Sequence, residues 1–278
     1  MRLIPDHLSA SYYQLVILAP GARRVPSAFQ NVVADPERYA AILAEMQRMR
    51  GSIYLRDGAI RPWNLTADGR HFQAADSRSW HLLTLDRDGR VSASVRYREH
   101  ENTVSFQELG LRNSALARDP EWGLRLQAAV ETELADARAR SLAYVEVGGW
   151  ALADERRCTT EALRTALATY GLAQILGGCL GVTTATVRNC SSSILRRIGG
   201  RVLEHSGTVF PKYYDSEYDC EMEILRFTSY AMNPRYEAWV DQIRNSLLTA
   251  PVLCPAADGA PTDFSDSLGY SEALAGAS

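Results

Sequence analysis

The chain has 278 residues, of which 46% are hydrophobic and 23% charged, and its 30 lysines and arginines face 33 aspartates and glutamates. These proportions exclude a collagen-like, low-complexity or wholly disordered chain. The net charge of −3 gives no overall attraction to nucleic acid or to an anionic membrane. No segment approaches the roughly 18 uninterrupted apolar residues of a membrane-spanning helix, and the N-terminus lacks the pattern of a signal peptide. We therefore expect a cytoplasmic protein with reduced cysteines and no membrane partner.

Two segments, 35–37 and 119–121, read Asp-Pro-Glu, with an N-cap residue before a proline at the first helical position. They predict helices that run to about Gly51 and Arg140. An Asp-Gly turn between alternating apolar residues predicts a hairpin over 79–98, and Gly171 is expected to end a helix that begins near 160. In chain order, the further expected elements are strands at 12–19, 142–152, 180–187, 201–205 and 220–227, with helices at 160–170, 189–197 and 234–247.

Helices and strands alternate in the second half, which predicts a mixed α/β sheet with helices on both faces. We divide the chain into an N-terminal extension packed on the core (1–35), a single domain (36–249) and a disordered tail (250–278). The tail is rich in small and turn-forming residues, and it holds four acidic side chains but no lysine or arginine. The mild acidity of the protein therefore belongs to the tail.

The segment before the helix expected at 160–170 is a candidate anion site. Arg156 and Arg157 precede Thr159 and Thr160. Small residues let an anion approach the free N–H groups of a helix N-terminus, and the arginines suit phosphate. The alternative is a hydroxyl-capped helix with solvated arginines. Cys158 in the same segment could act as a nucleophile, although no histidine lies near it in the sequence.

Glu146 lies in an apolar strand, where burial should raise its pKa toward a value useful to a general base. The alternative is a strand residue whose side chain points to water. The adjacent pair Gly148 and Gly149 fits a strand that bulges or lets a ligand come close. The five histidines are scattered and the five cysteines lack ligand spacing, so no metal site is expected.

The order of these motifs resembles the GCN5-related N-acyltransferase (GNAT) superfamily. The sequence R-x-x-T-x-A at 157–162 is similar to its pyrophosphate loop, and V-R-N at 187–189, a short helix and I-G-G at 198–200 are similar to its later segment. Thr160 stands where the loop usually has glycine, which narrows the space for pyrophosphate. The superfamily's frequent general-acid tyrosine is absent after Asn189, and a thiolate leaving group hardly needs one.

A narrower resemblance is to acyl-homoserine-lactone synthases and long-chain N-acyl amino acid synthases. E-V-G-G-W-A-L at 146–152 looks like their E-x-S-R-F-x-V strand, and R-G-S-I-Y at 50–54 and V-S-A-S-V-R-Y at 91–97 fit the same pattern. The resemblance covers about residues 36–228. Gly149 replaces the family's arginine and Trp150 its phenylalanine, so the acceptor contacts should differ.

The resemblance implies a GNAT-like fold of class α/β (α+β), with a mixed, mainly antiparallel central sheet, helices on both faces and a splayed central strand pair. It implies an acyltransferase that moves an acyl group from a CoA or phosphopantetheine thioester directly to the amine of a small molecule or amino acid, in autoinducer or secondary-metabolite biosynthesis. Glu146 would be the general base. The implied donor-binding residues are Val147, Trp150, Leu152, Arg156, Arg157, Thr159, Thr160 and Asn189. The implied acceptor or acyl pocket holds Arg96, Tyr213 and Tyr214.

The sequence does not decide which molecule carries the acyl group, because it also holds a basic cluster. The cluster comprises Arg188, Arg196, Arg197, Arg201 and Lys212. These side chains could simply be solvated, or they could dock an acidic acyl carrier protein or an aminoacyl-tRNA donor. Transfer from tRNA is the less favoured alternative within the enzyme class. Outside that class, the alternative is a non-catalytic module that binds an acyl-CoA or a partner protein.

Overall fold

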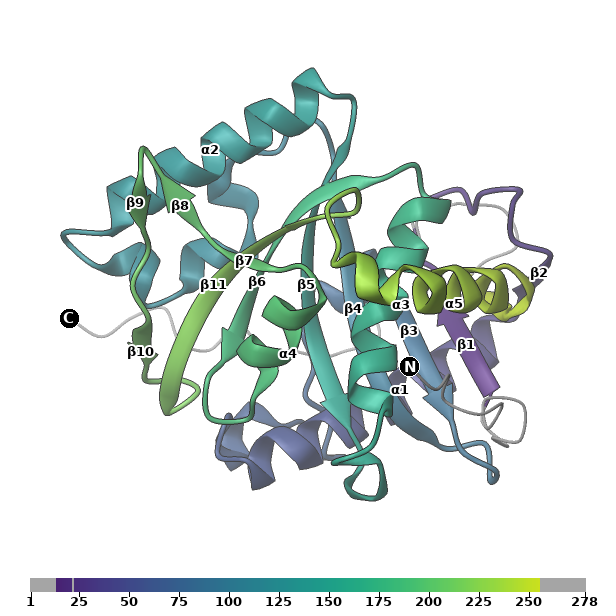
Figure 1. Cartoon of the computed structure of the whole chain (residues 1–278). Coiled ribbons are helices and arrows are strands. Elements are labelled where there is room, and N and C mark those ends of the chain that lie inside the picture. The colour runs from purple at the N-terminus through teal and green to yellow at the C-terminus, as the bar shows by residue number, and fades with distance from the viewer. Residues whose placement is uncertain (1–13, 22, 256–278) are drawn as a thin grey trace.

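The computed structural model describes residues 14–21 and 23–255 (Figure 1). The strands of its main sheet are β1 (Gln14–Leu18), β2 (Asn31–Ala34), β3 (Trp80–Leu85), β4 (Val91–His100), β5 (Ala143–Leu152), β6 (Cys179–Thr186), β7 (Arg201–Val202), β10 (Tyr213–Asp215), β11 (Cys220–Thr228) and β12 (Pro251–Cys254). A small hairpin pairs β8 (Glu204–His205) with β9 (Thr208–Val209). The helices are α1 (Pro36–Arg56), α2 (Gly123–Ala139), α3 (Glu161–Ile175), α4 (Ser191–Ile198) and α5 (Glu237–Thr249).

The ten-stranded sheet has the order β10-β11-β6-β5-β4-β3-β1-β12-β2, with β7 paired to β11. Most neighbours are antiparallel, and the pairs β5–β6, β1–β12 and β12–β2 are parallel. Side chains alternate between the faces, so that Ile17 of β1 packs with α3 and α5 while Val16 and Leu18 pack with α1. Helix α2 covers the α1 side farther along the sheet. The expected mixed, mainly antiparallel sheet with helices on both faces is confirmed (Figure 1).

The central strands β5 and β6 part, as the resemblance implied. Their parallel register runs from Ala143 opposite Cys179 to Glu146 opposite Val182. Beyond that point β5 continues to Leu152 along β4, while β6 continues along β11. Within residues 14–21 and 23–255, the separation leaves one edge of each strand without a strand partner, which provides space and backbone polar groups for a ligand.

Two helices run past the glycines that were expected to end them. Helix α1 continues beyond Gly51 to Arg56, and α3 continues through Gly171 to Ile175. A Cβ atom on Gly51 would lie 2.9 Å from the Gly69 carbonyl oxygen, and one on Gly171 would lie 3.3 Å from the Cα of Arg244 in α5. Both glycines therefore permit close packing against the helix. Helix α2 begins at Gly123, later than expected, after a turn in which Asp119 accepts from backbone N–H groups.

The boundaries expected at 35/36 and 249/250 do not divide the folded body. Strand β12 lies between β1 and β2, and its Val252 and Leu253 are fully buried. A strand of four residues carries too little pattern to stand out in a segment rich in turn formers. The other residues of the expected extension and tail, 1–13 and 256–278, lie outside the described residues. In the described part, no helix has both the length and the apolar character needed to cross a membrane.

Candidate functional site

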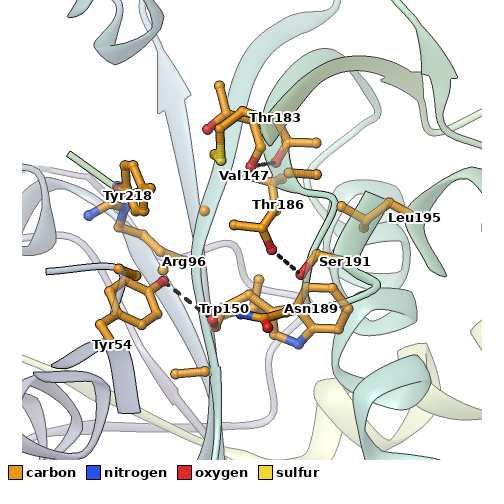
Figure 2. A pocket seen from close by; sticks show the side chains of 18 of the residues that line it. Tyr54, Arg96, Val147, Trp150, Thr183, Thr186, Asn189, Ser191, Leu195 and Tyr218 are labelled. Carbon is orange, nitrogen blue, oxygen red and sulfur yellow. Dashed lines mark hydrogen bonds between the residues drawn. The ribbon is translucent and has the colours of Figure 1, made fainter. Parts of the chain in front are cut away.

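The parting of β5 and β6 opens a cavity of about 890 Å³, with walls from both strands, from α3 and α4, and from the end of α1. In Figure 2, Thr186, Ser191 and Leu195 lie on the α4 side of β5, and Arg96 lies between Tyr54 and Tyr218 on the other side. The cavity therefore has one wall rich in hydroxyl and aliphatic groups and another that is aromatic and basic.

A β-bulge shapes the strand that crosses the cavity. Ser94 pairs with Ala151 and Arg96 with Gly148, so Gly149 and Trp150 together face Val95. Gly149 has a φ of +61°, in the left-handed region that glycine tolerates best. A Cβ there would lie 3.2 Å from the Cβ of Arg96. The bulge expected from the glycine pair is present, and it turns backbone groups of 148–150 out of the ladder.

Glu146 lies in the cavity wall just where β5 and β6 separate, but its pKa shifts in the direction opposite to the expected one. Its Oε1 accepts from Leu111 N (2.9 Å), and its Oε2 accepts from Gly110 N (3.0 Å) and lies 3.0 Å from His100 Nε2. Burial raises the pKa of Glu146, yet the hydrogen bonds from His100, Gly110 and Leu111 outweigh burial and hold it below the usual value. Glu146 is thus a firmly held carboxylate and a weaker base than predicted.

Arg96 is attached to a buried ionic network. Its Nη1 lies 3.0 Å from Asp76 Oδ1, and Asp76 also pairs with Arg50 on α1. Burial raises the pKa of Asp76, but Arg50, with smaller effects from His81 and Arg96, reverses this effect and holds the pKa well below the usual range. One buried carboxylate therefore serves two guanidinium groups, and the cavity wall at Arg96 retains positive charge.

The expected phosphate segment only partly faces the cavity. Arg157 and Thr159 line it, whereas Thr160 does not, and Arg156 is 7% exposed and lies outside the lining residues. The segment Asp154–Arg156 is a turn of 3₁₀-helix, and the backbone is extended at Arg157, so the two neighbouring arginines lie in different backbone conformations. Thr159 Oγ1 accepts from Glu161 N at 3.1 Å, while Thr160 makes no side-chain cap. The helix start is hydroxyl-capped, but by Thr159.

Arg157 is not free at the cavity mouth. Its Nη1 lies 3.2 Å from Asp57 Oδ1, and the backbone oxygen of Asp57 accepts from Arg188 Nη2 at 2.6 Å. Asp57 itself lines the cavity. Asp57, at the end of α1, therefore forms an ion pair with the arginine that was predicted to bind phosphate.

The other predicted positions divide between the cavity and the surface. Tyr213 lines the cavity, but Tyr214 is 59% exposed and its hydroxyl donates to Asp219. Adjacent residues of β10 point to opposite faces, so both tyrosines could not have lined one pocket. The predicted donor and acceptor residues that do line the cavity are Val147, Trp150, Leu152, Arg157, Thr159, Asn189, Arg96 and Tyr213.

Sequence reasoning missed His100, Asp57, Tyr54 and Tyr218 as residues of the site. Each comes to the site through an element far away in the chain, and only the register of β4 against β5 would have placed His100 near Glu146. Cys158 is exposed and lines the cavity, but among the described residues no base hydrogen-bonds to its thiol. The same part of the chain holds no group of three His, Cys, Asp or Glu side chains arranged for a metal.

No family model and no curated protein matches the sequence. The fold does match solved structures. Two structures of BjaI, a CoA-dependent acyl-homoserine lactone synthase, one with MTA and one with SAM and isopentyl-CoA, superpose with TM-scores of 0.53 and 0.50. They are 11% and 12% identical, and each match covers 89% of this chain and 96% of BjaI. FeeM, an N-acyl amino acid synthase from uncultured soil microbes, matches over 71% of this chain and 88% of its own at 10% identity and a TM-score of 0.45. The likeness to BjaI shows that this chain has a GNAT-like fold.

Proposed function

We infer that the protein is an N-acyltransferase that moves an acyl group from a CoA thioester to the amine of a small molecule or amino acid. The observation that carries this inference is the cavity at the separation of β5 and β6. Unpaired strand edges hydrogen-bond well to an extended chain of amides, as a pantetheine arm is. The choice of CoA as carrier is supported by the likeness to BjaI, which is CoA-dependent and was solved with isopentyl-CoA.

The reaction needs little from the protein beyond position and charge. The amine nitrogen attacks the thioester carbonyl carbon, an N–C bond forms, and the C–S bond breaks with departure of the thiolate. Backbone N–H groups of 147–150, the segment that ends in the bulge, stabilise the oxyanion. The proton lost by the amine passes through a water molecule to Glu146, which is ionised at neutral pH and stands ready to accept it.

The donor lies on the α4 side of β5, against Val147, Trp150 and Leu152, with Asn189 beside its arm. Its phosphates bind at Arg157 and the N-terminus of α3, where they replace the carboxylate of Asp57. The acceptor lies on the other side, at Arg96 and Tyr213. Arg156, Thr160 and Tyr214 have no part in these contacts. The products that this chemistry favours are N-acyl amides of the autoinducer or secondary-metabolite kind.

Turnover tests this function. The purified protein is incubated with isopentyl-CoA and a panel of amines that includes amino acids and SAM, and the free CoA thiol and the mass of the acyl amide are measured. We expect thiol release that depends on one acceptor and falls by roughly 100-fold in Glu146→Gln. Glu237→Gln, an exposed carboxylate on α5, is the matched control. Thiol release that needs no acceptor would reject the function, and equal release by Glu146→Gln would reject the role of Glu146 as general base.

A further inference from the structure

His100 and Glu146 meet across two neighbouring strands of the central sheet. Arg98 lies directly opposite Glu146 in the β4–β5 register, and His100 follows two residues later on the same face of β4. The imidazole Nε2 lies 3.0 Å from Glu146 Oε2, and His100 is only 7% exposed. Because an ionised carboxylate can only accept hydrogen bonds, the imidazole must carry its proton on Nε2.

The two oxygens of Glu146 are occupied unequally. Oε2 receives the hydrogen bonds of His100 and Gly110 N, and Arg98 Nη1 lies 3.6 Å away. Among the residues that the structure describes, only Leu111 donates its N–H to Oε1. A carboxylate has about two acceptor sites on each oxygen. Oε2 is therefore filled, and Oε1 keeps one site for a further donor in the cavity that Glu146 lines.

Other charged groups lie near His100 and Glu146, but they do not take the place of the hydrogen bond between these two residues. Glu108, in the 3₁₀ turn Phe106–Glu108, has its pKa lowered mainly by hydrogen bonds from the N–H and hydroxyl of Ser105 and slightly by His100, so its carboxylate is already held. Tyr144, two residues before Glu146, is faced by Glu131 and Glu133 of α2, and Arg226 of β11 pairs with Glu133. Among these neighbours, only Arg98 and His100 bring a cationic or N–H side chain to Glu146.

We propose that His100 is a positioning residue for acyl transfer: its Nε2–H, together with the N–H of Gly110, fills Oε2 of Glu146, so that Oε1 alone receives the amine proton through its water. The proposal deepens the function inferred above and rests on it. His100 touches neither donor nor acceptor, since it does not line the cavity. It acts through the orientation of the Glu146 carboxylate and the number of donors that the carboxylate receives.

Two substitutions separate positioning from packing. His100→Gln keeps an N–H donor at about the reach of Nε2, whereas His100→Leu removes the donor. Because a catalytic group misplaced by about 1 Å can cost about 100-fold in rate, we expect kcat/KM to fall roughly 10- to 100-fold in His100→Leu with little change in the KM for isopentyl-CoA. His100→Gln should recover most of this loss. Loss of a donor raises the pKa of the carboxylate, so the acid limb of the pH profile should move to higher pH in His100→Leu only.

The opposite results would overturn the proposal. If both variants lose the same activity at every pH, in proportion to their loss of thermal stability, His100 has only a structural role. The nitrogen spectrum of the imidazole ring gives a readout that does not need turnover. An Nε2–H tautomer that changes in Glu146→Gln supports the pair, and an Nδ1–H tautomer in the wild type overturns it. A wild type with no thiol release would reject the proposed function, and the ring spectrum would still decide whether His100 holds Glu146.

Discussion

Arg50 and Asp76 form a two-pronged ion pair, with Nη1–Oδ1 at 3.0 Å and Nη2–Oδ2 at 2.7 Å, and both side chains are almost fully buried. Arg50 comes from α1, and Asp76 precedes β3. The same carboxylate binds Arg96 in the cavity wall. The pair therefore fixes the basic side of the candidate site to the core of the fold.

We predict that Arg50→Met destabilises the protein by about 3–5 kcal/mol, because it leaves a buried carboxylate without its main partner. Urea unfolding measures the loss. The control is Arg140→Ala, which breaks an exposed pair with Asp136 on one helix and should cost at most about 0.5 kcal/mol. Similar losses in the two variants would contradict the assigned role of the buried pair.

Stability should fall as the pH falls from about 6.5 toward 4. Burial, aided by Arg50, lowers the pKa of His71 to about 4, and burial lowers the pKa of His81 to about 4 although Asp76 opposes it. Unfolded histidines titrate near 6.5, so in this window the unfolded chain binds more protons and folding weakens. The charging of each histidine should lower the free energy of unfolding by on the order of 3 kcal/mol across this window.

Urea unfolding at several pH values tests this dependence. His81→Gln keeps an N–H for the Asp76 carbonyl, which lies 2.8 Å from His81 Nε2, but it removes one titrating group. The slope of stability against pH should therefore become shallower in this variant. An unchanged slope, or a wild type whose stability is flat between pH 7 and 5, would disprove the assignment.

Gly149→Ala should damage both stability and activity. The left-handed backbone alone costs about 1–2 kcal/mol for a residue with a Cβ. Gly89 has a φ of +77°, and a Cβ added to it would meet nothing within 4 Å, so Gly89→Ala measures that cost alone. At Gly149 the crowding by Arg96 adds to it and shifts the bulge N–H groups. We expect kcat/KM to fall roughly tenfold or more in Gly149→Ala and to stay unchanged in Gly89→Ala.

Asp57 and Arg157 should act on donor binding in opposite directions. Arg157→Ala removes a phosphate partner and should weaken CoA binding roughly tenfold. Asp57→Asn removes the carboxylate that the donor must displace from Arg157. CoA binding should therefore tighten, because Arg157 can pair with the phosphates without first leaving an ion pair. Calorimetric titration with CoA measures both, with exposed Arg235→Ala as the control, since Arg235 does not line the cavity. Weaker binding in Asp57→Asn would show that this pair supports the site.

The sequence predicted the central strands because their signal is local. The apolar run around Glu146 and the glycine pair after it mark β5 and its bulge without reference to any other element. The structural roles of Gly51 and Gly171 could not be predicted from the sequence. A glycine that ends a helix and a glycine that lets a neighbouring backbone pack closely against the helix look the same in sequence. The partners of Glu146 depend on register: His100 is 46 residues away, and Gly110 and Leu111 approach from a separate turn. For that reason the direction of the Glu146 pKa shift was predicted wrongly.

The central claim is that the cavity between β5 and β6 holds the thioester donor, and calorimetric titration with isopentyl-CoA tests it most directly. Ser191 lines the cavity and lies 3.2 Å from Thr186 Oγ1, whereas Ser193 on the same helix is exposed and outside the lining. We predict that wild type and Ser193→Trp bind isopentyl-CoA equally and that Ser191→Trp binds it at least roughly tenfold more weakly, because the indole occupies part of the cavity. Absence of binding by the wild type, or equal binding by all three proteins, would contradict the account.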